Sequence, residues 1–268
     1  MSRIQNVFDS LRANNKKALI PYLTAGDPQP GFTVSLMHTL VKAGADIIEV
    51  GVPFSDPMAD GPTIQLACER ALAFNVSLSD VLDMVAEFRQ TNNNTPVVLM
   101  GYLNPIEVMG YESFASRAHS VGVDGLLTVD MPPEESLNVL SILEKFEIDP
   151  IFLVSPESTS ARFSLIAKHS KGFIYYVSLK GVTGVKRIDI PAVSNKLSQL
   201  RELTRLPIGV GFGINDAESA AAVATIADAV VVGSSIVKRI ADNVNDQDKM
   251  EKEIHEFLSE LRNAIDGV

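Results

Sequence analysis

The chain has 268 residues, 46% of them hydrophobic, and a formal net charge of −10. It has one cysteine, Cys68, which excludes an intrachain disulfide. The acidic balance and the lack of a Lys/Arg-rich run argue against nucleic acid or an anionic membrane surface as a partner. The N-terminus lacks the apolar segment of a leader, and no stretch approaches ~18 consecutive apolar residues, so we expect a soluble, cytoplasmic protein.

Short apolar segments alternate with longer helical patterns from one end of the chain to the other. The N-terminus opens with apolar residues at helical spacing: Ile4, Val7, Phe8 and Leu11. The pattern then predicts eight strands: Ala18–Leu23, Asp46–Val50, Pro96–Gly101, Gly125–Val129, Pro150–Val154, Gly172–Val177, Pro207–Gly211 and Ala229–Gly233.

Helical patterns fill the intervals between these strands. They cover Gly31–Lys42, Pro62–Phe74, Leu78–Gln90, Glu112–Ser120, Glu134–Phe146, Ser160–His169, Ala192–Leu203, Ala217–Ala224 and Asp248–Ala264. No linker or shift in composition marks a domain boundary. We therefore predict an α/β fold, a single (β/α)8 TIM barrel over residues 1–268 with an additional N-terminal helix.

Glu49 is a carboxylate inside an apolar segment that otherwise has the pattern of a buried strand. Side chains alternate along a strand, so Glu49 lies on the face opposite Ile48 and Val50. If those two residues pack on helices, Glu49 points into the mouth of the barrel, where catalytic groups of this fold are found. A buried carboxylate is costly unless it is paired or functional. Glu49 is thus either a structural residue satisfied by buried donors or a catalytic acid–base.

A second carboxylate, Asp60, lies at the end of a loop rich in turn-forming residues, Pro53–Pro62. A carboxylate at a strand end followed by one on the next loop suits acid–base chemistry. The alternative is that Asp60 only caps the following helix. Asp56 and Asp130 are weaker candidates, because prolines beside them favour a turn or a helix entry.

Two glycine clusters, Gly209–Ile214 and Val232–Ser235, close the seventh and eighth predicted strands. A phosphate site built from the loops after strands 7 and 8, with a helix N-terminus, recurs in this fold. Backbone N–H groups and the helix dipole bind the anion there, so no basic side chain is required. The alternative is that these glycines only permit tight turns.

Other chemistries lack the residues that they need. The four histidines, His38, His119, His169 and His255, all fall in helical patterns, so a zinc or iron site at the strand ends is not expected. No lysine lies inside a predicted strand, which removes the usual Schiff-base nucleophile of a barrel aldolase. The segment Ser178–Val185 is polar and contains glycines, so it is either a lid or an ordinary loop.

Four segments carry a resemblance to a known family: Tyr22–Pro28, Glu49–Pro62, Gly181–Gly184 and Gly211–Ile214. Over essentially its whole length the chain resembles the tryptophan synthase α subunit family, and the second segment is highly specific for it. The resemblance implies a lyase of tryptophan biosynthesis. The implied reaction is the retro-aldol cleavage of indole-3-glycerol phosphate to indole and glyceraldehyde 3-phosphate.

The resemblance also implies a partner. It predicts a β subunit that carries pyridoxal phosphate, usually in an αββα heterotetramer. Indole is expected to pass to this subunit through a tunnel. It implies no cofactor and no metal in this chain itself.

The catalytic pair of the family is carried onto Glu49 and Asp60. Asp60 is suited to stabilise positive charge at the indole N–H. Burial should raise the pKa of Glu49, which suits this residue to exchange protons with indole C3 and with the glycerol hydroxyl. Thr183, on the lid, resembles the residue that orients the Asp60 carboxylate. The expected phosphate ligands are Gly184, Gly213, Gly233 and Ser234. The expected indole pocket, for which plain barrel core is the alternative, comprises Tyr22, Met100, Tyr102, Leu127, Val129, Leu153, Tyr175, Phe212 and Val232.

This chain departs from the family pattern at three places. Many members have Ser-Arg before the glycine of the lid motif, where this chain has Leu179 and Lys180, so an arginine role in closing the lid is not carried over. Met58 replaces a common Leu, which conserves volume. Tyr22 stands where many members have Phe, which adds a hydroxyl at the expected indole pocket.

Two rival functions stay open. The first is another phosphate-binding barrel enzyme of the same pathway, which would use the same glycine clusters. The second is a non-catalytic barrel that only activates a partner. The Pro53–Pro62 loop and the absence of a strand lysine argue against the first rival, and the presence of both Glu49 and Asp60 argues against the second.

Overall fold

The computed structural model describes residues 2–178, 188–211 and 213–268. Its strands are β1 (Ala18–Thr24), β2 (Ile48–Gly51), β3 (Val97–Gly101), β4 (Gly125–Thr128), β5 (Asp149–Ile151), β6 (Leu153–Val154), β7 (Ile174–Val177), β8 (Ile208–Gly211) and β9 (Ala229–Val232). Its α-helices are α1 (Arg3–Ala13), α2 (Thr33–Lys42), α3 (Pro62–Leu72), α4 (Leu78–Arg89), α5 (Leu103–Met109), α6 (Tyr111–Val121), α7 (Leu137–Lys145), α8 (Ser160–His169), α9 (Ile190–Arg201), α10 (Ala217–Ala224), α11 (Ser234–Asp242) and α12 (Gln247–Asp266). A 3₁₀ turn, η1 (Pro30–Phe32), precedes α2.

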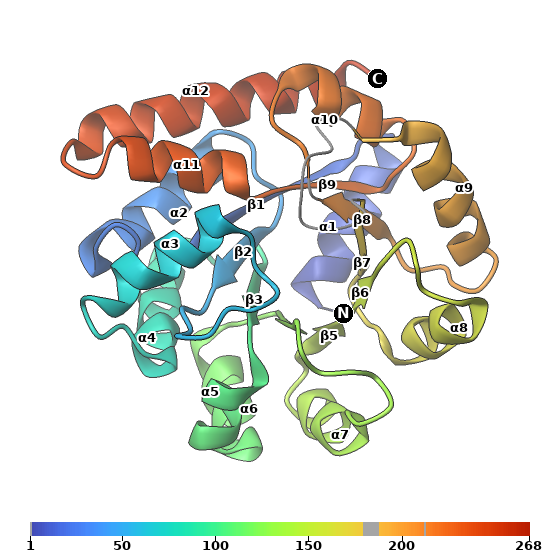
Figure 1. Ribbon diagram of the computed structural model, residues 1–268, viewed down its shortest axis with the longest axis horizontal. Coiled ribbons are helices and arrows are strands. Elements are labelled where there is room, and N and C mark those ends of the chain that lie inside the picture. The colour runs from blue at the N-terminus through green and yellow to red at the C-terminus, as the bar shows by residue number, and fades with distance from the viewer. Residues whose placement is uncertain (1, 179–187, 212) are drawn as a thin grey trace.

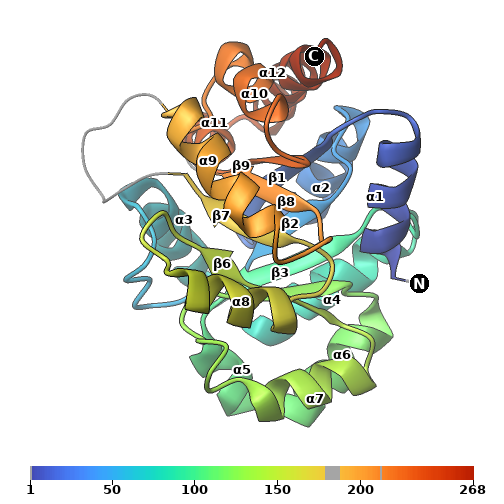
Figure 2. The same cartoon turned by 90° about the vertical axis from the view of Figure 1, so that its right-hand side faces the viewer.

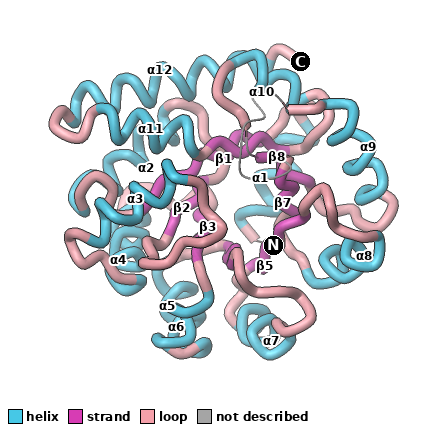
Figure 3. Tube along the Cα trace, in the orientation of Figure 1, coloured by secondary structure: helices cyan, strands magenta, loops and turns pink. Residues whose placement is uncertain are grey.

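The strands form one parallel sheet that closes on itself. Their order is β5-β4-β3-β2-β1-β9-β8-β7-β6, and its two ends are consecutive in the chain, separated by Phe152 alone. The Tyr175 N–H donates to the Phe152 carbonyl at 3.1 Å, so residues 149–154 act as one strand that joins both ends of the sheet. Figure 3 shows the ring of strands with the helices around it. The predicted barrel is confirmed, and its fifth strand is divided at Phe152.

Alternation of side chains along the strands divides the core into two layers. The outer layer lies between the sheet and the helices. The inner layer fills the barrel and takes residues from most strands: Ala18, Ile20, Ile47, Val98, Leu127, Ile151, Phe173, Tyr175, Ala229 and Val231.

The predicted N-terminal helix closes one end of this barrel. Ile4 and Phe8 of α1 belong to the inner layer, and the rings of Phe8 and Phe173 lie 5.9 Å apart. Because Phe173 precedes β7, this is the end at which the strands begin, and Figure 2 shows α1 there. A binding site inside the barrel must therefore open at the carboxyl ends of the strands.

Local sequence signals set the helices that surround the barrel. α4 begins with a capping box, in which Ser77 Oγ accepts from the Asp80 N–H and the Asp80 carboxylate accepts from the Ser77 N–H. The apolar stripe predicted for the last helix is buried in α12: Ile254, Phe257, Leu258 and Leu261. α12 packs across α2, α10 and α11 (Figure 1). No helix in the described part of the chain is both long and apolar enough to cross a bilayer.

Three helices differ from the prediction. α11 (Ser234–Asp242) was given no predicted range, although a helix was expected to begin after the eighth strand. α5 was not predicted, because its seven residues are too few to show a helical period. α7 begins at Leu137 rather than Glu134. Before it, Ser136 Oγ donates to the Pro133 carbonyl at 2.9 Å, and prolines 132 and 133 have no N–H groups for a helical turn.

A buried ion pair fixes α3 against the loop after β1. Arg70 on α3 forms a bidentate pair with Asp27, with Nε–Oδ1 at 2.6 Å and Nη2–Oδ2 at 2.9 Å. Asp27 is 1% exposed, and burial raises its pKa while the guanidinium opposes that rise. Because α3 directly follows the loop that carries Asp60, this pair anchors the downstream end of that loop.

Candidate active site

Glu49 points into the barrel mouth, as the alternation along β2 predicts. Its neighbours Ile48 and Val50 belong to the outer layer, whereas Ile47 belongs to the inner one. Glu49 pairs in register with Tyr22 of β1 and with Val98 of β3. The side chain therefore stands near the carboxyl end of the strands, above the apolar filling of the barrel.

The Glu49 carboxyl is held in its protonated form by its surroundings. The residue is 2% exposed, and its Oε1 has no hydrogen-bond partner among the described residues. Burial, with a smaller contribution from the charge of Asp60, raises the pKa of Glu49 from 4.5 to about 8. A carboxyl with this pKa can both give and take a proton near neutral pH, which suits general acid–base catalysis.

Asp60 lies on the loop between β2 and α3, and its backbone and side chain are both fixed. Its N–H donates to the Pro57 carbonyl at 3.0 Å, and its carbonyl accepts from Gln65 Nε2 at 2.9 Å. Its Oδ2 accepts from the Tyr102 hydroxyl at 3.0 Å. Burial raises the pKa of Asp60, and the Tyr102 hydrogen bond opposes that rise. The N-cap of α3 is Gly61, and no side chain caps this helix, so the helix-cap alternative for Asp60 is wrong.

Two tyrosines cross the barrel mouth, and each depends on a glycine of another strand. A Cβ on Gly51 would lie 2.1 Å from the Tyr22 hydroxyl, and one on Gly211 would lie 2.2 Å from the Tyr175 hydroxyl. Both distances are far below van der Waals contact, so only glycine fits. Burial raises the pKa of both phenols, and the charges of Glu49 and Asp60 add to it. The hydroxyls therefore lie near both carboxyl groups.

The other predicted indole-pocket residues divide into three groups. Leu127 is fully buried in the inner layer, and Met100, Val129 and Leu153 pack against that layer. Val232 was predicted to line the pocket, but it belongs to the outer layer. Side chains alternate along β9, so Val231 points into the barrel instead. Phe212 lies outside the described residues.

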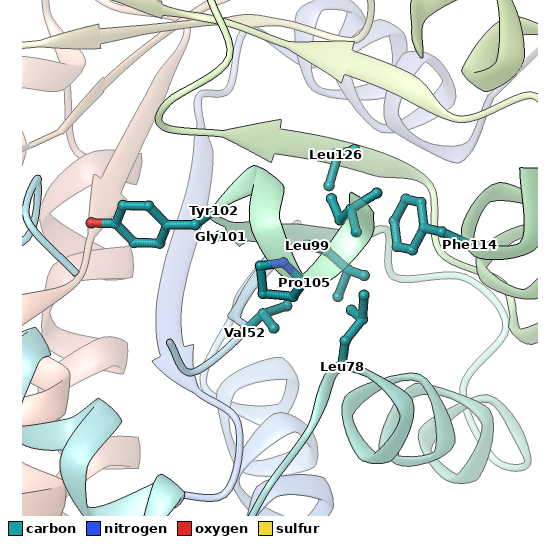
Figure 4. Close-up of a pocket in the computed structure, with 9 residues that line it drawn as sticks. Val52, Leu78, Leu99, Gly101, Tyr102, Pro105, Phe114 and Leu126 are labelled. Carbon is teal, nitrogen blue, oxygen red and sulfur yellow. The ribbon is translucent and has the colours of Figure 1, made fainter. Parts of the chain in front are cut away.

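Tyr102 is placed differently from a simple pocket wall. It directly follows β3, and its hydroxyl is used by the Asp60 loop. A cavity of about 10 Å³ lies behind its backbone, among Val52, Leu78, Leu99, Gly101, Pro105, Ile106, Phe114 and Leu126. In Figure 4 the Tyr102 hydroxyl points away from this cavity. The cavity has room for about one water molecule and is no substrate site.

A larger groove, of about 610 Å³, lies at the opposite end of the barrel. It is lined by Ser2, Arg3, His119, Gly122, Val123, Asp124, Glu144, Glu147, Ile148, Asp149 and Lys171. Several of its charges pair with one another, such as Arg3 with Asp124 at 2.8 Å and Lys171 with Glu144 at 2.8 Å. Active sites of this fold lie at the carboxyl ends of the strands, so this groove is not the candidate site.

Three of the four predicted phosphate ligands lie where β8 and β9 end. Gly213 has a φ of +81°, and Gly233 is the N-cap of α11, with Ser234 as its first residue. No side chain caps α11, which leaves its first N–H groups to an external acceptor. Ser235 Oγ donates to the Ile214 carbonyl at 3.0 Å and so joins the two loops. Gly184 and the lid residue Thr183 lie outside the described residues.

Across residues 2–178, 188–211 and 213–268, no three His, Cys, Asp or Glu side chains gather as a metal site would require. Cys68 is buried on α3, as a small core residue.

Comparison with known proteins identifies the family. A family model described as tryptophan synthase alpha chain matches residues 8–266. The tryptophan synthase alpha chain of Thioalkalivibrio sulfidiphilus is 59% identical over 266 residues, which cover 99% of this chain and 100% of that relative. The chain belongs to the tryptophan synthase alpha chain family. It is accordingly a lyase of tryptophan biosynthesis that acts on indole-3-glycerol phosphate.

Other tryptophan synthase alpha chains agree in sequence and in structure. That of Marinobacter nauticus is 57% identical, covering 100% of this chain and 99% of the relative. The crystal structure of tryptophan synthase subunit alpha from Legionella pneumophila is similar with a TM-score of 0.93 at 46% identity, covering 100% of both chains. A chain of Mycobacterium tuberculosis tryptophan synthase has a TM-score of 0.89 at 38% identity and 98% coverage of both chains.

Proposed function

We propose that Glu49 and Asp60 together catalyse the retro-aldol cleavage of indole-3-glycerol phosphate to indole and glyceraldehyde 3-phosphate. The observation that carries this proposal is the raised pKa of Glu49, about 8, on a buried carboxyl that stands in the barrel mouth near Asp60. Two carboxyl groups with different surroundings can take different roles in one reaction.

The chemistry assigns one role to each carboxyl group. The bond between indole C3 and the glycerol chain breaks only after C3 accepts a proton, which makes the ring electron-poor. Protonated Glu49 gives that proton, and ionised Asp60 at the ring N–H stabilises the positive charge. The bond electrons then return to the ring, while the carboxylate of Glu49 takes the proton of the glycerol hydroxyl. Indole and the aldehyde leave, and Glu49 is protonated again.

The substrate phosphate is assigned to the loops after β8 and β9. Gly213, Gly233 and Ser234 offer backbone N–H groups beside the uncapped N-terminus of α11, which favours an anion. Gly184 and Thr183 are proposed, from the family resemblance alone, to complete the site from the lid. The indole ring is assigned to the apolar space around Tyr22, Met100, Leu127, Tyr175 and Val231, with Phe212 as a further expected member.

The partner proposed for this chain is a tryptophan synthase β subunit, which would hold pyridoxal phosphate and receive the indole in an αββα assembly. Family membership supports the partner. Two highly exposed apolar side chains also support it: Met58, 87% exposed on the Asp60 loop, and Val108, 82% exposed on α5. Both elements follow strand ends, so a partner at this face would lie beside the barrel mouth.

An assay of indole release separates this function from its rivals. The purified chain is incubated with indole-3-glycerol phosphate, and indole is measured. Release of indole together with glyceraldehyde 3-phosphate supports the proposal. Conversion of the substrate to another product would favour a different phosphate-binding barrel enzyme, and no turnover with or without a β subunit would favour a non-catalytic partner protein.

A further inference from the structure

Tyr102 connects β3 to the loop that carries Asp60. It follows β3 directly and is the N-cap residue of α5, so its backbone is fixed by two elements. Tyr102 is 5% exposed. Its side chain extends away from the apolar cavity behind β3 (Figure 4), toward a loop that lies more than forty positions earlier in the chain.

The Tyr102 hydroxyl makes two hydrogen bonds to consecutive loop residues. It accepts from the Ala59 N–H at 3.0 Å and donates to Asp60 Oδ2 at 3.0 Å. A phenol has one proton, and that proton is used by Asp60. The hydroxyl thus fixes the backbone just before Asp60 and also orients the Asp60 carboxylate. Because the hydroxyl donates to this carboxylate, it favours the ionised form of Asp60.

The Tyr102 ring makes a third contact, at the start of the same loop. It stacks on Phe54 with ring centroids 5.0 Å apart and an interplanar angle of 28°. The loop is therefore held at both of its ends by one side chain. The part between them carries Met58, which is 87% exposed and free to meet a partner.

We propose that Tyr102 is a positioning residue that acts through Asp60, rather than a wall of the indole pocket. It holds the Asp60 carboxylate on the barrel mouth and links it to the partner-facing part of the loop. This inference rests on the proposed function of Asp60. It also defines a clear contrast, because a wall needs only the ring of Tyr102, whereas positioning needs the hydroxyl.

The other titratable groups near Asp60 come from four elements. They are Tyr22 on β1, Glu49 on β2, Cys68 on α3 and Tyr175 on β7, each of which interacts electrostatically with Asp60. The Tyr102 hydroxyl donates its hydrogen bond to Asp60 Oδ2 and to none of these groups. A shift in the acid limb of activity in such a variant therefore reports on Asp60.

The test compares Tyr102→Phe with a matched control, Tyr111→Phe. Tyr111 also donates to a carboxylate, Glu107 Oε1 at 2.7 Å, but on the surface of α5 and α6. In Tyr102→Phe we expect kcat for indole formation to fall roughly ten- to a hundred-fold, the size of effect that misplacing a catalytic group produces. KM should change by less than about two-fold, because the ring is kept. Tyr111→Phe should match the wild type.

Two further readouts separate positioning from a structural role. The acid limb of the kcat/KM profile should move to higher pH in Tyr102→Phe, because Asp60 loses a donor that favours its ionised form. In an Asp60→Asn background, Tyr102→Phe should have almost no further effect, because both changes act through one group. Thermal unfolding checks that each variant folds; if Tyr102→Phe does not, Phe54→Leu, which removes the stacked ring, should lower kcat in the same direction.

The outcomes separate the inference from the function on which it rests. A wild type that forms no indole overturns the proposed function and this role with it. An active wild type with an unchanged kcat and acid limb in Tyr102→Phe overturns the inference alone. Multiplicative losses in Tyr102→Phe and Asp60→Asn would also overturn it, since Tyr102 would then act independently of Asp60.

Discussion

At the scale of single residues, one buried carboxyl group explains most of the site. Glu49 stands in an apolar strand, and its Oε1 meets no hydrogen-bond partner among the described residues. Burial therefore raises the pKa of Glu49 to about 8, and the folded chain keeps this group protonated at a cost in stability. The same burial that destabilises the fold prepares the group for proton transfer.

Stability should depend on pH through Glu49. Since its folded-state pKa is raised above the ordinary 4.5, the folded state is favoured below about pH 4.5, and this contribution is lost as pH rises to about 8. Glu49→Gln removes the titrating group. Its free energy of unfolding relative to wild type should therefore increase by on the order of a few kcal/mol from pH 4.5 to pH 8.5. Urea unfolding at a series of pH values measures this difference, and Glu69→Gln, at an exposed position, is the control. If the free energy of unfolding of Glu49→Gln and of the wild type changed equally with pH, the raised pKa of Glu49 would be contradicted.

The pH dependence of the rate should show both carboxyl groups. The reaction needs Glu49 protonated, so kcat/KM should fall as pH rises through about 8. It also needs Asp60 ionised, and because burial raises the pKa of Asp60, the acid limb should lie above the usual range for aspartate. The pH profile of the residual kcat/KM of Glu49→Gln should lack the alkaline limb near pH 8. An alkaline limb that persists unchanged in that variant would assign it to another group.

At the scale of elements, glycines on the strands decide which side chains fit across the barrel mouth. Gly51 on β2 leaves the space that the Tyr22 ring of β1 occupies, and Gly211 on β8 does the same for Tyr175 on β7. Each glycine is a diagonal neighbour of the tyrosine on the adjacent strand, and it must be small because the tyrosine is large. Glycine in a strand otherwise weakens it, so its presence here marks a close approach.

Gly51→Ala should destabilise the chain by roughly 1–3 kcal/mol, the usual cost of overpacking, because its Cβ would lie 2.1 Å from the Tyr22 hydroxyl. Gly31→Ala is the matched control, since a Cβ there meets nothing within 4 Å. Adding Tyr22→Phe to Gly51→Ala should recover part of the loss. Equal melting temperatures for Gly51→Ala and Gly31→Ala would show that the pair can separate at little cost.

The N-terminus of α11 gives a second prediction at this scale. A phosphate or sulfate ion added to crystals should lie against the N–H groups of Gly213, Gly233 and Ser234, because no side chain caps this helix. Crystallography with inorganic phosphate tests it. An ion bound instead by lysine or arginine side chains at another strand end would contradict the assignment.

Much of the fold could be predicted because its signals are local. The strands, the barrel and all nine predicted inter-strand and terminal helices follow from periodicity and turn residues, most of them with shifted ends. α5 could not be predicted, because seven residues do not define a period. Phe152, which divides the fifth strand, carries no local sign of the break.

The site was less predictable, because it depends on contacts between distant segments. Glu49 could be found from its place in an apolar strand. Val232 was misassigned, since the alternation gives two faces but not which of them is internal at a strand end; Val231 is the inner residue. The role of the Tyr102 hydroxyl could not be read from the sequence, because Asp60 lies forty-two positions away.

At the scale of the whole molecule, the barrel has one closed end and one open end. α1 closes the end where the strands begin, and the catalytic candidates lie at the other end. The exposed Met58 lies on the same loop as Asp60. A partner that binds this loop can therefore change the catalytic geometry, and by linkage substrate should tighten its binding.

Adding a cognate β subunit should raise the rate of indole formation ten-fold or more, about 1.4 kcal/mol of barrier. Met58→Asp should weaken this activation by raising the concentration of β subunit that is required. Leu203→Asp is the control, since Leu203 is also exposed but lies between α9 and β8, at the other end of the barrel. A titration of the β subunit with each variant measures this. Identical activation curves for Met58→Asp and the control would place the interface elsewhere.

The most direct test of the central claim is the rate of indole formation from indole-3-glycerol phosphate by Glu49→Gln at saturating β subunit. Glutamine keeps the size and burial of the side chain and removes the transferable proton. The expected result is a fall of at least ~10²-fold relative to wild type, the usual contribution of a general acid–base, with an unchanged circular dichroism spectrum. Turnover close to that of the wild type would contradict the claim that Glu49 transfers the proton.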